Sequence, residues 1–206
     1  MSKQTVITIS RQYGSGGRLI GQRLAEILSI PFYDNHLISL AAQKAGYNED
    51  ILKSADERPA SSFLYSSLMG NYALGAQYPG GVSMPLNDHL FLLQSGLIKD
   101  AAREGSCVII GRCANYVLKD LPHLFSVFVH APITDRIERA INEYKLPQEK
   151  IRETIEKIDK RRAAYYNYYT DSRWGKQESY HLSINSSLLG VEKTAEVLAH
   201  IVILTA

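Results

Sequence analysis

The residues best suited to chemistry lie in one short stretch near the N-terminus. It combines three glycines and a serine with two arginines, namely Arg11, Gly14, Ser15, Gly16, Gly17 and Arg18. A β-branched run at 6–9 precedes this stretch, and apolar residues follow it at helical spacing through Leu28. Glycines let backbone N–H groups approach an anion, and a helix N-terminus adds partial positive charge. We therefore predict a phosphate-binding loop; the alternative is a tight turn between a strand and its packing helix.

The loop differs from the standard phosphate-binding motif, which is Gly, four residues and then Gly-Lys-Ser/Thr. No lysine follows the glycines, and Gly17-Arg18-Leu19 stands where Gly-Lys-Ser/Thr would be. Counting from the end of the strand instead places Gly17 at the lysine position and Arg18 just after it. Neither register supplies the hydroxyl that usually holds magnesium. Arginines must therefore supply any cationic charge at this loop.

Two further polar residues follow predicted strands. Asp34 comes after a short strand at 30–33, where it is either a ligand contact or the N-cap of a helix at about 36–45. Arg112 follows the apolar run 107–110, which is typical of a buried parallel strand. Ligands of open α/β sheets bind at the carboxyl ends of the strands. Arg112 is accordingly predicted to contact a ligand, with a structural ion pair as the alternative.

A long helix is predicted from Pro147 to about Tyr169, and its second half carries cations and then tyrosines. The cationic run 159–162 includes Arg161 and Arg162, and 165–169 holds four tyrosines. Such a pair of clusters can clamp phosphates and stack on a base. It can equally be a helix end whose cations suit the helix dipole, with the tyrosines packed below.

The whole-chain composition excludes some classes of partner. The chain has 206 residues, with 23 Lys and Arg against 21 Asp and Glu, so no global attraction to nucleic acid or membrane is expected. No apolar run approaches the length of a membrane span. The two cysteines, Cys107 and Cys113, show no metal-ligand pairing with the histidines, and a reduced cytoplasmic compartment is expected.

Strands and helices alternate along the chain, with further strands predicted at 125–129 and 181–185 and a closing helix at 191–202. The segment 59–87 is unusual because it contains no Asp, Glu, Lys, Arg or His but many aromatic residues. Disordered linkers are usually charged and poor in aromatics. We expect this segment to pack on its own core, on a ligand, or on a second subunit in a homodimer.

Taken together, these blocks resemble the cytidylate kinase-like family of P-loop nucleoside-monophosphate kinases. The blocks that carry the resemblance are 7–18, 31–34, 108–114, 159–162 and 184–190, and they span nearly the whole chain. The resemblance implies a three-layer α/β P-loop kinase fold, with a parallel sheet flanked by helices in one domain, 1–206. It also implies a small inserted acceptor lobe at about 46–90 and a lid at about 147–180.

The family resemblance implies transfer of the ATP γ-phosphoryl group to a nucleoside monophosphate such as CMP or dCMP, or to another small acceptor, with magnesium. Residues 14–18 and Arg11 would hold the donor phosphates, and Asp34 and Arg112 the acceptor. Arg161 and Arg162 would close over the transferring group as lid arginines. The alternative is a protein of the same fold that has lost catalysis and acts as a nucleotide sensor or interaction partner.

Some positions depart from the family pattern. True cytidylate kinases carry acidic residues where this chain has Ile110 and Cys113, and a Tyr-Arg pair where it has Ile38-Ser39. We expect Arg18 to replace the P-loop lysine, because arginine is always charged and grips phosphate with two parallel hydrogen bonds. With no protein metal ligands predicted, magnesium would be held mainly by the nucleotide.

Overall fold

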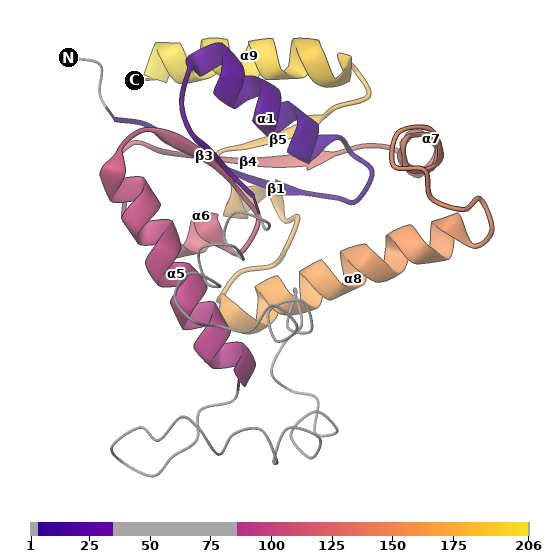
Figure 1. Ribbon diagram of the computed structural model, residues 1–206, viewed down its shortest axis with the longest axis horizontal. Coiled ribbons are helices and arrows are strands. Elements are labelled where there is room, and N and C mark those ends of the chain that lie inside the picture. Colours follow the sequence, from indigo (N-terminus) through magenta and orange to yellow (C-terminus); the bar gives the residue numbers. More distant parts are fainter. Residues whose placement is uncertain (1–3, 35–85, 206) are drawn as a thin grey trace.

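The computed structural model describes residues 4–34 and 86–205, and these form an α/β fold built on one parallel sheet (Figure 1). The five strands lie in the order β2-β3-β1-β4-β5, and every neighbouring pair is parallel. Their bounds are β1 Val6–Arg11, β2 Phe32–Tyr33, β3 Cys107–Ile110, β4 Leu124–His130 and β5 Leu182–Asn185. The strand that leads into the glycine-rich loop is therefore the central one.

Helices cover both faces of the sheet, as the three-layer prediction requires. They are α1 Gly17–Leu28, α5 Leu86–Glu104, α6 Ala114–Val117, α7 Ile133–Asn142, α8 Ile151–Tyr169 and α9 Gly190–Thr205, with a short 3-10 turn at Gln177–Ser179. Helices α1 and α9 lie on one face, and α5 and α6 on the other (Figure 1). Helix α8 runs beneath the sheet from α7 toward the N-terminal half of α5.

The alternation of apolar residues along β1 explains the two faces of the core. Ile7 and Ile9 are fully buried in the cluster shared with α1 and α9. Val6 belongs to the opposite cluster, where α5 and α6 pack. Because successive side chains of a strand point to opposite faces, one central strand anchors both helix layers. This holds the carboxyl end of β1, and the loop after it, on a rigid support.

The tyrosines at the end of α8 are part of the core between α8, α5 and α6. Tyr165 and Tyr166 are buried, and the Tyr166 hydroxyl accepts a hydrogen bond of 2.8 Å from Nδ2 of Asn115 on α6. The Tyr169 ring stacks on Phe91 of α5 with ring centroids 4.1 Å apart. These three rings therefore attach α8 to its neighbours, which favours the packing interpretation for them over stacking on a base.

The cysteines are free thiols inside the fold. Cys107 and Cys113 are both buried, and neither forms a disulfide. Burial, helped by the nearby Glu104 carboxylate, raises the pKa of the Cys107 thiol to about 11. A thiol of that pKa stays protonated near neutral pH, so Cys107 acts as a packing residue of β3 and not as a nucleophile.

Most predicted elements are present, with shifted ends. The long helix begins at Ile151 and not at Pro147, because Lys150 adopts a left-handed conformation, φ 53°, at its N-cap. The predicted helix at about 36–45 and segment 59–85 lie outside the described residues, as does the predicted acceptor lobe at 46–90 apart from its last residues, which begin α5. Across 4–34 and 86–205, no helix is both long and apolar enough to cross a membrane.

Candidate phosphate-binding site

The glycine-rich loop leaves the central strand at Arg11 and enters α1 at Gly17. Gly14 and Gly16 have φ values of 78° and 77°, in the left-handed region that glycine adopts without strain. A Cβ atom at Gly14 would lie 2.6 Å from the backbone oxygen of Arg136, so this position also lacks space for a side chain. Ser15 is fully buried, and its hydroxyl donates a hydrogen bond of 2.9 Å to the Gln12 carbonyl.

Three consecutive carbonyl groups of the loop are held by the surrounding protein. Arg136 Nη1 donates to the carbonyl of Tyr13 at 3.2 Å, and Arg139 Nη1 to that of Gly14 at 2.8 Å. The Ser186 hydroxyl donates to the carbonyl of Ser15 at 2.6 Å. In a trans peptide the next N–H points opposite to the carbonyl. The N–H groups that follow are therefore turned away from these donors.

The N–H groups of the loop have the arrangement of an anion site. No hydrogen bond among residues 4–34 and 86–205 uses the backbone N–H of Gly14, Gly16 or Gly17. Gly16 is the N-cap of α1, whose first N–H groups carry the positive end of the helix dipole. N–H groups at such a turn and helix start are suited to hold a phosphate.

A buried ion pair clamps the loop from the side of α7 and α8. The Arg136 guanidinium on α7 pairs with the Asp159 carboxylate on α8, and these side chains are only 8% and 14% exposed. Asp159 Oδ1 accepts a hydrogen bond of 2.7 Å from the backbone N–H of Tyr13, while Arg136 donates to the carbonyl of the same residue. Both backbone polar groups of Tyr13 are thus fixed by one charge pair.

Arg162 is the other link between α8 and the loop. Its Nη1 donates to the Arg11 carbonyl at 3.2 Å, and its guanidinium lies 5.6 Å from the centre of the Tyr13 ring. Burial raises the pKa of the Tyr13 hydroxyl, and the positive charge of Arg162 partly opposes this. Arg161 is exposed on the same helix. Of the two predicted lid arginines, the structure brings Arg162 against the loop.

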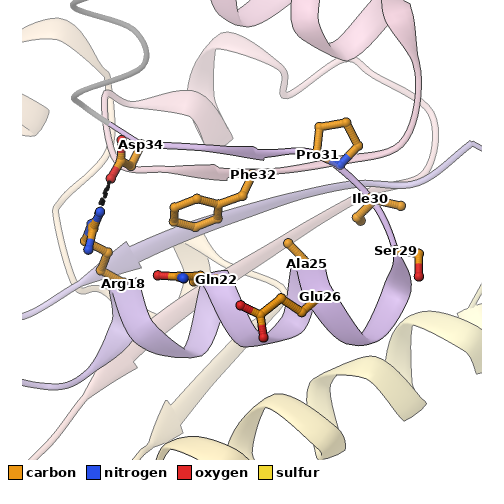
Figure 2. Close-up of a pocket in the computed structure, with 9 residues that line it drawn as sticks. All are labelled: Arg18, Gln22, Ala25, Glu26, Ser29, Ile30, Pro31, Phe32 and Asp34. Carbon is orange, nitrogen blue, oxygen red and sulfur yellow. Dashed lines mark hydrogen bonds and ion pairs between the residues drawn. The ribbon is translucent and has the colours of Figure 1, made fainter.

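Arg18 points toward the end of β2 and away from the loop. Its Nη2 forms an ion pair of 2.7 Å with Oδ2 of Asp34, and its Nε donates to the same oxygen at 2.8 Å. Figure 2 shows this pair at one end of a groove of about 620 Å³ between α1 and β2. The groove is lined by apolar side chains such as Phe32 and also by polar ones, among them Gln22 and Glu26. It therefore lies beside the phosphate loop and is not the loop's own anion site.

The turn after β3 brings Arg112 to the same edge of the sheet. Gly111, Arg112 and Cys113 have φ values of 71°, 55° and 54°, three left-handed residues in succession. Non-glycine residues in this region cost of order 1–3 kcal/mol each and are concentrated at functional sites. Arg112 is only 5% exposed. This strained turn buries Arg112 at the carboxyl end of β3, and its contact with a ligand stays a prediction.

The structure thus places Arg11, residues 14–17 and Arg162 in one cluster, puts Arg112 in the turn after the neighbouring strand β3, and pairs Arg18 with Asp34. Arg136 and Arg139 were not among the site residues predicted from the sequence. The sequence does contain a pattern that could have pointed to them, because two arginines three residues apart follow a buried strand and a helix-initiating proline. No local pattern, however, could show that they bind the loop's carbonyls.

ATP requires donors for its phosphates, and Mg²⁺ requires oxygen ligands. The three available N–H groups and the arginines fit a chain of phosphates. The two nearby oxygen groups that could bind Mg²⁺ already have partners, because the Ser15 hydroxyl donates to the Gln12 carbonyl and the Asp34 carboxylate is paired with Arg18. Residues 4–34 and 86–205 contain no group of three or more His, Cys, Asp or Glu side chains arranged to hold a metal.

A central parallel strand, a glycine-rich anion loop and a helix, inside a sheet with helices on both faces, define a P-loop kinase fold. The solved structures agree. An uncharacterized protein from Eubacterium ventriosum is 23% identical over 97% of this chain and 98% of that chain, with a TM-score of 0.68. Two shikimate kinases share the same architecture. The one from Bacteroides thetaiotaomicron is 13% identical over 97% and 98% of the two chains, with a TM-score of 0.55.

The other shikimate kinase, from Acinetobacter baumannii and solved with shikimate, is 15% identical over 98% of this chain and 94% of that chain, with a TM-score of 0.53. Identities this low establish the fold alone. No curated protein sequence matches the chain.

The family is established by the sequence itself. The profile of the cytidylate kinase-like family matches residues 6–188, and the chain belongs to that family. The match begins with the first residue of β1 and ends just after β5, so it includes all five strands and the phosphate loop. The family and the fold are those of nucleotide kinases in general.

Proposed function

We propose that this protein is an ATP-dependent kinase that transfers the γ-phosphoryl group to a nucleoside monophosphate of the CMP or dCMP type. The observation that carries the proposal is the loop at 12–17: the protein holds the carbonyls of Tyr13, Gly14 and Ser15, while the N–H groups of Gly14, Gly16 and Gly17 make no hydrogen bond within the described residues. Membership of the cytidylate kinase-like family supports the nucleotide as ligand.

Phosphoryl transfer needs little covalent help from a protein, so catalysis depends on positioning and on charge. In the proposed reaction the loop N–H groups hold the donor phosphates, and Arg162 holds α8 against the loop. Arg112 is assigned to the acceptor side, because it follows the neighbouring strand β3. Kinases of this fold generally use Mg²⁺ with ATP. No step is assigned here to a protein-bound metal.

We assign the acceptor to the region of Asp34 and Arg18, which lie together at one end of the groove in Figure 2. A carboxylate there accepts hydrogen bonds from an amino or hydroxyl group, and a guanidinium 57% exposed remains able to contact an anion. Both features are suited to a small polar acceptor.

The test is an ATP-consumption assay with CMP, dCMP, UMP, AMP, GMP and shikimate as separate acceptors, each with and without Mg²⁺. We expect CMP or dCMP to accelerate ADP formation at least tenfold over the acceptor-free rate. Gly14→Ala is the matched control for contaminating activity, because its added Cβ would clash with the Arg136 backbone. The acceleration should be absent from this variant.

Other outcomes separate the alternatives. ATP binding with no ADP formation for any acceptor would contradict the kinase and leave the sensor hypothesis. Acceleration by shikimate alone would place the chain among kinases of non-nucleoside acceptors. Absence of ATP binding altogether would contradict both nucleotide-based hypotheses.

A further inference from the structure

Two glycines from different parts of the chain make room for a single arginine. A Cβ atom at Gly17 would lie 2.6 Å from Cβ and 3.2 Å from Cγ of Arg11. A Cβ atom at Gly111 would overlap Nη1 of the same arginine. The stem of Arg11 therefore crosses Gly17, the second residue after Ser15, and its guanidinium reaches Gly111 at the carboxyl end of β3. Either glycine, replaced by any other residue, would displace this side chain.

The standard P-loop pattern shows what this arrangement replaces. That pattern is Gly, four residues, Gly and then Lys, with the lysine reaching the β- and γ-phosphates. Aligned on Gly16, the first glycine of the pattern falls on Arg11 and the lysine on Gly17. The chain thus has a cationic residue where the motif has glycine, and glycine where the motif has its cation. The two differences are coupled, because side chains at both positions would collide.

We infer that Arg11 is the phosphate-binding cation of this loop and takes the place of the P-loop lysine from the end of the strand. The inference rests on the proposed function, since it assigns a role within the same ATP site. Arg11 is the last residue of β1, the central strand, so its backbone is held in the sheet. Arg162 donates to its carbonyl at 3.2 Å, which fixes the backbone from which the stem projects.

The position of Arg18 supports this assignment over the one expected from the sequence. Arg18 donates through both Nε and Nη2 to Asp34 at the end of β2. Figure 2 shows its side chain reaching from the start of α1 across to that carboxylate. Arg11, by contrast, crosses between the loop and β3, where parallel α/β proteins bind their ligands. On this geometry Arg18 acts at the acceptor side and Arg11 at the donor phosphates.

The test exchanges the two residues. Binding of ATP, ADP and AMP is measured by calorimetry for the parent, Arg11→Met, Gly17→Lys and the double variant Arg11→Gly/Gly17→Lys, with melting temperatures alongside. Methionine keeps an unbranched stem and removes only the charge. We expect Arg11→Met to weaken ATP binding about 10- to 100-fold, which corresponds to the loss of a charged hydrogen-bonding pair. AMP binding should be weakened much less. Its melting temperature should stay close to that of the parent.

Gly17→Lys alone should melt lower and bind ATP poorly, because the new stem collides with that of Arg11. The double variant restores the standard spacing, so it should recover the melting temperature and bring ATP affinity to within a few-fold of the parent. Arg103→Met, which removes an exposed arginine of α5, is the control and should bind like the parent.

The outcomes separate this inference from the function on which it rests. ATP binding by the parent together with unchanged affinity in Arg11→Met would overturn the inference and leave the proposed function standing. An equal loss of affinity for ATP and AMP in Arg11→Met would also overturn the inference, because such a loss would indicate a structural role for Arg11. A greater loss of ATP affinity in Arg18→Ala than in Arg11→Met would assign the role to Arg18. A parent that does not bind ATP would overturn the proposed function itself.

Discussion

Replacing Asp159 with alanine is expected to lower the free energy of unfolding by about 3–5 kcal/mol, the cost of breaking a buried ion pair by removing one partner. Arg136 would keep its charge with its side chain only 8% exposed. The N–H of Tyr13 would also lose its acceptor at 2.7 Å. For a chain of this size such a loss lowers the melting temperature by on the order of 10 °C. Thermal and urea unfolding measure it directly.

Two comparisons isolate the cause. Asp159→Asn keeps an oxygen for the Tyr13 N–H but leaves Arg136 without its counter-charge, so it should be destabilised nearly as much as the alanine variant. Glu153→Gln, an exposed change on the same helix, should stay within about 0.5 kcal/mol of the parent. Parent-like stability of Asp159→Ala would contradict the clamp described for α7, α8 and the loop.

Arg162→Ala is expected to lower the rate of ATP turnover by about 10²–10³-fold, the size of effect seen when one preorganised hydrogen-bond donor of an active site is lost. The side chain donates to the Arg11 carbonyl and lies over the Tyr13 ring, so it holds both ends of the loop's first turn. It is half-buried and takes no part in the two apolar clusters of the sheet. Steady-state kinetics with the best acceptor, together with melting curves, measure both effects.

The matched control for Arg162→Ala is Arg152→Ala on the same helix, where an arginine 61% exposed pairs with Glu156. An exposed pair of this kind contributes little to stability, and its loss should leave turnover unchanged. If Arg162→Ala instead unfolds several degrees lower and retains its turnover per folded molecule, Arg162 supports the fold and does not serve catalysis.

The fold was largely predictable because its signals are local. The β-branched run before the loop, the apolar segment 107–110 and the helical spacing after Gly17 all gave elements of the right type. The family resemblance was confirmed by the profile match. The strand order was not predictable from these patterns, since it depends on which segments pair across more than a hundred residues.

The site was less predictable, because it depends on contacts between residues that lie far apart in the sequence. The loop's partners Arg136, Arg139 and Asp159 lie more than 120 residues away in the sequence, and only the packing of α7 and α8 brings them to Tyr13 and Gly14. The tyrosines of α8 form a cluster that is visible in the sequence, but the cluster alone does not reveal their role. A tyrosine cluster beside arginines left stacking on a base and packing below the helix equally open, and only tertiary packing shows that three of these tyrosines contact the core.

The central claim is that the loop N–H groups hold the phosphates of a nucleotide. The most direct measurement is the backbone amide NMR spectrum of the ¹⁵N-labelled protein during titration with ADP, and separately with AMP. We predict that the amides of Gly14, Gly16 and Gly17 shift strongly with ADP and only weakly with AMP, because the second phosphate reaches the loop. Unchanged positions for these three amides at saturating ADP, with shifts confined to other regions, would contradict the account.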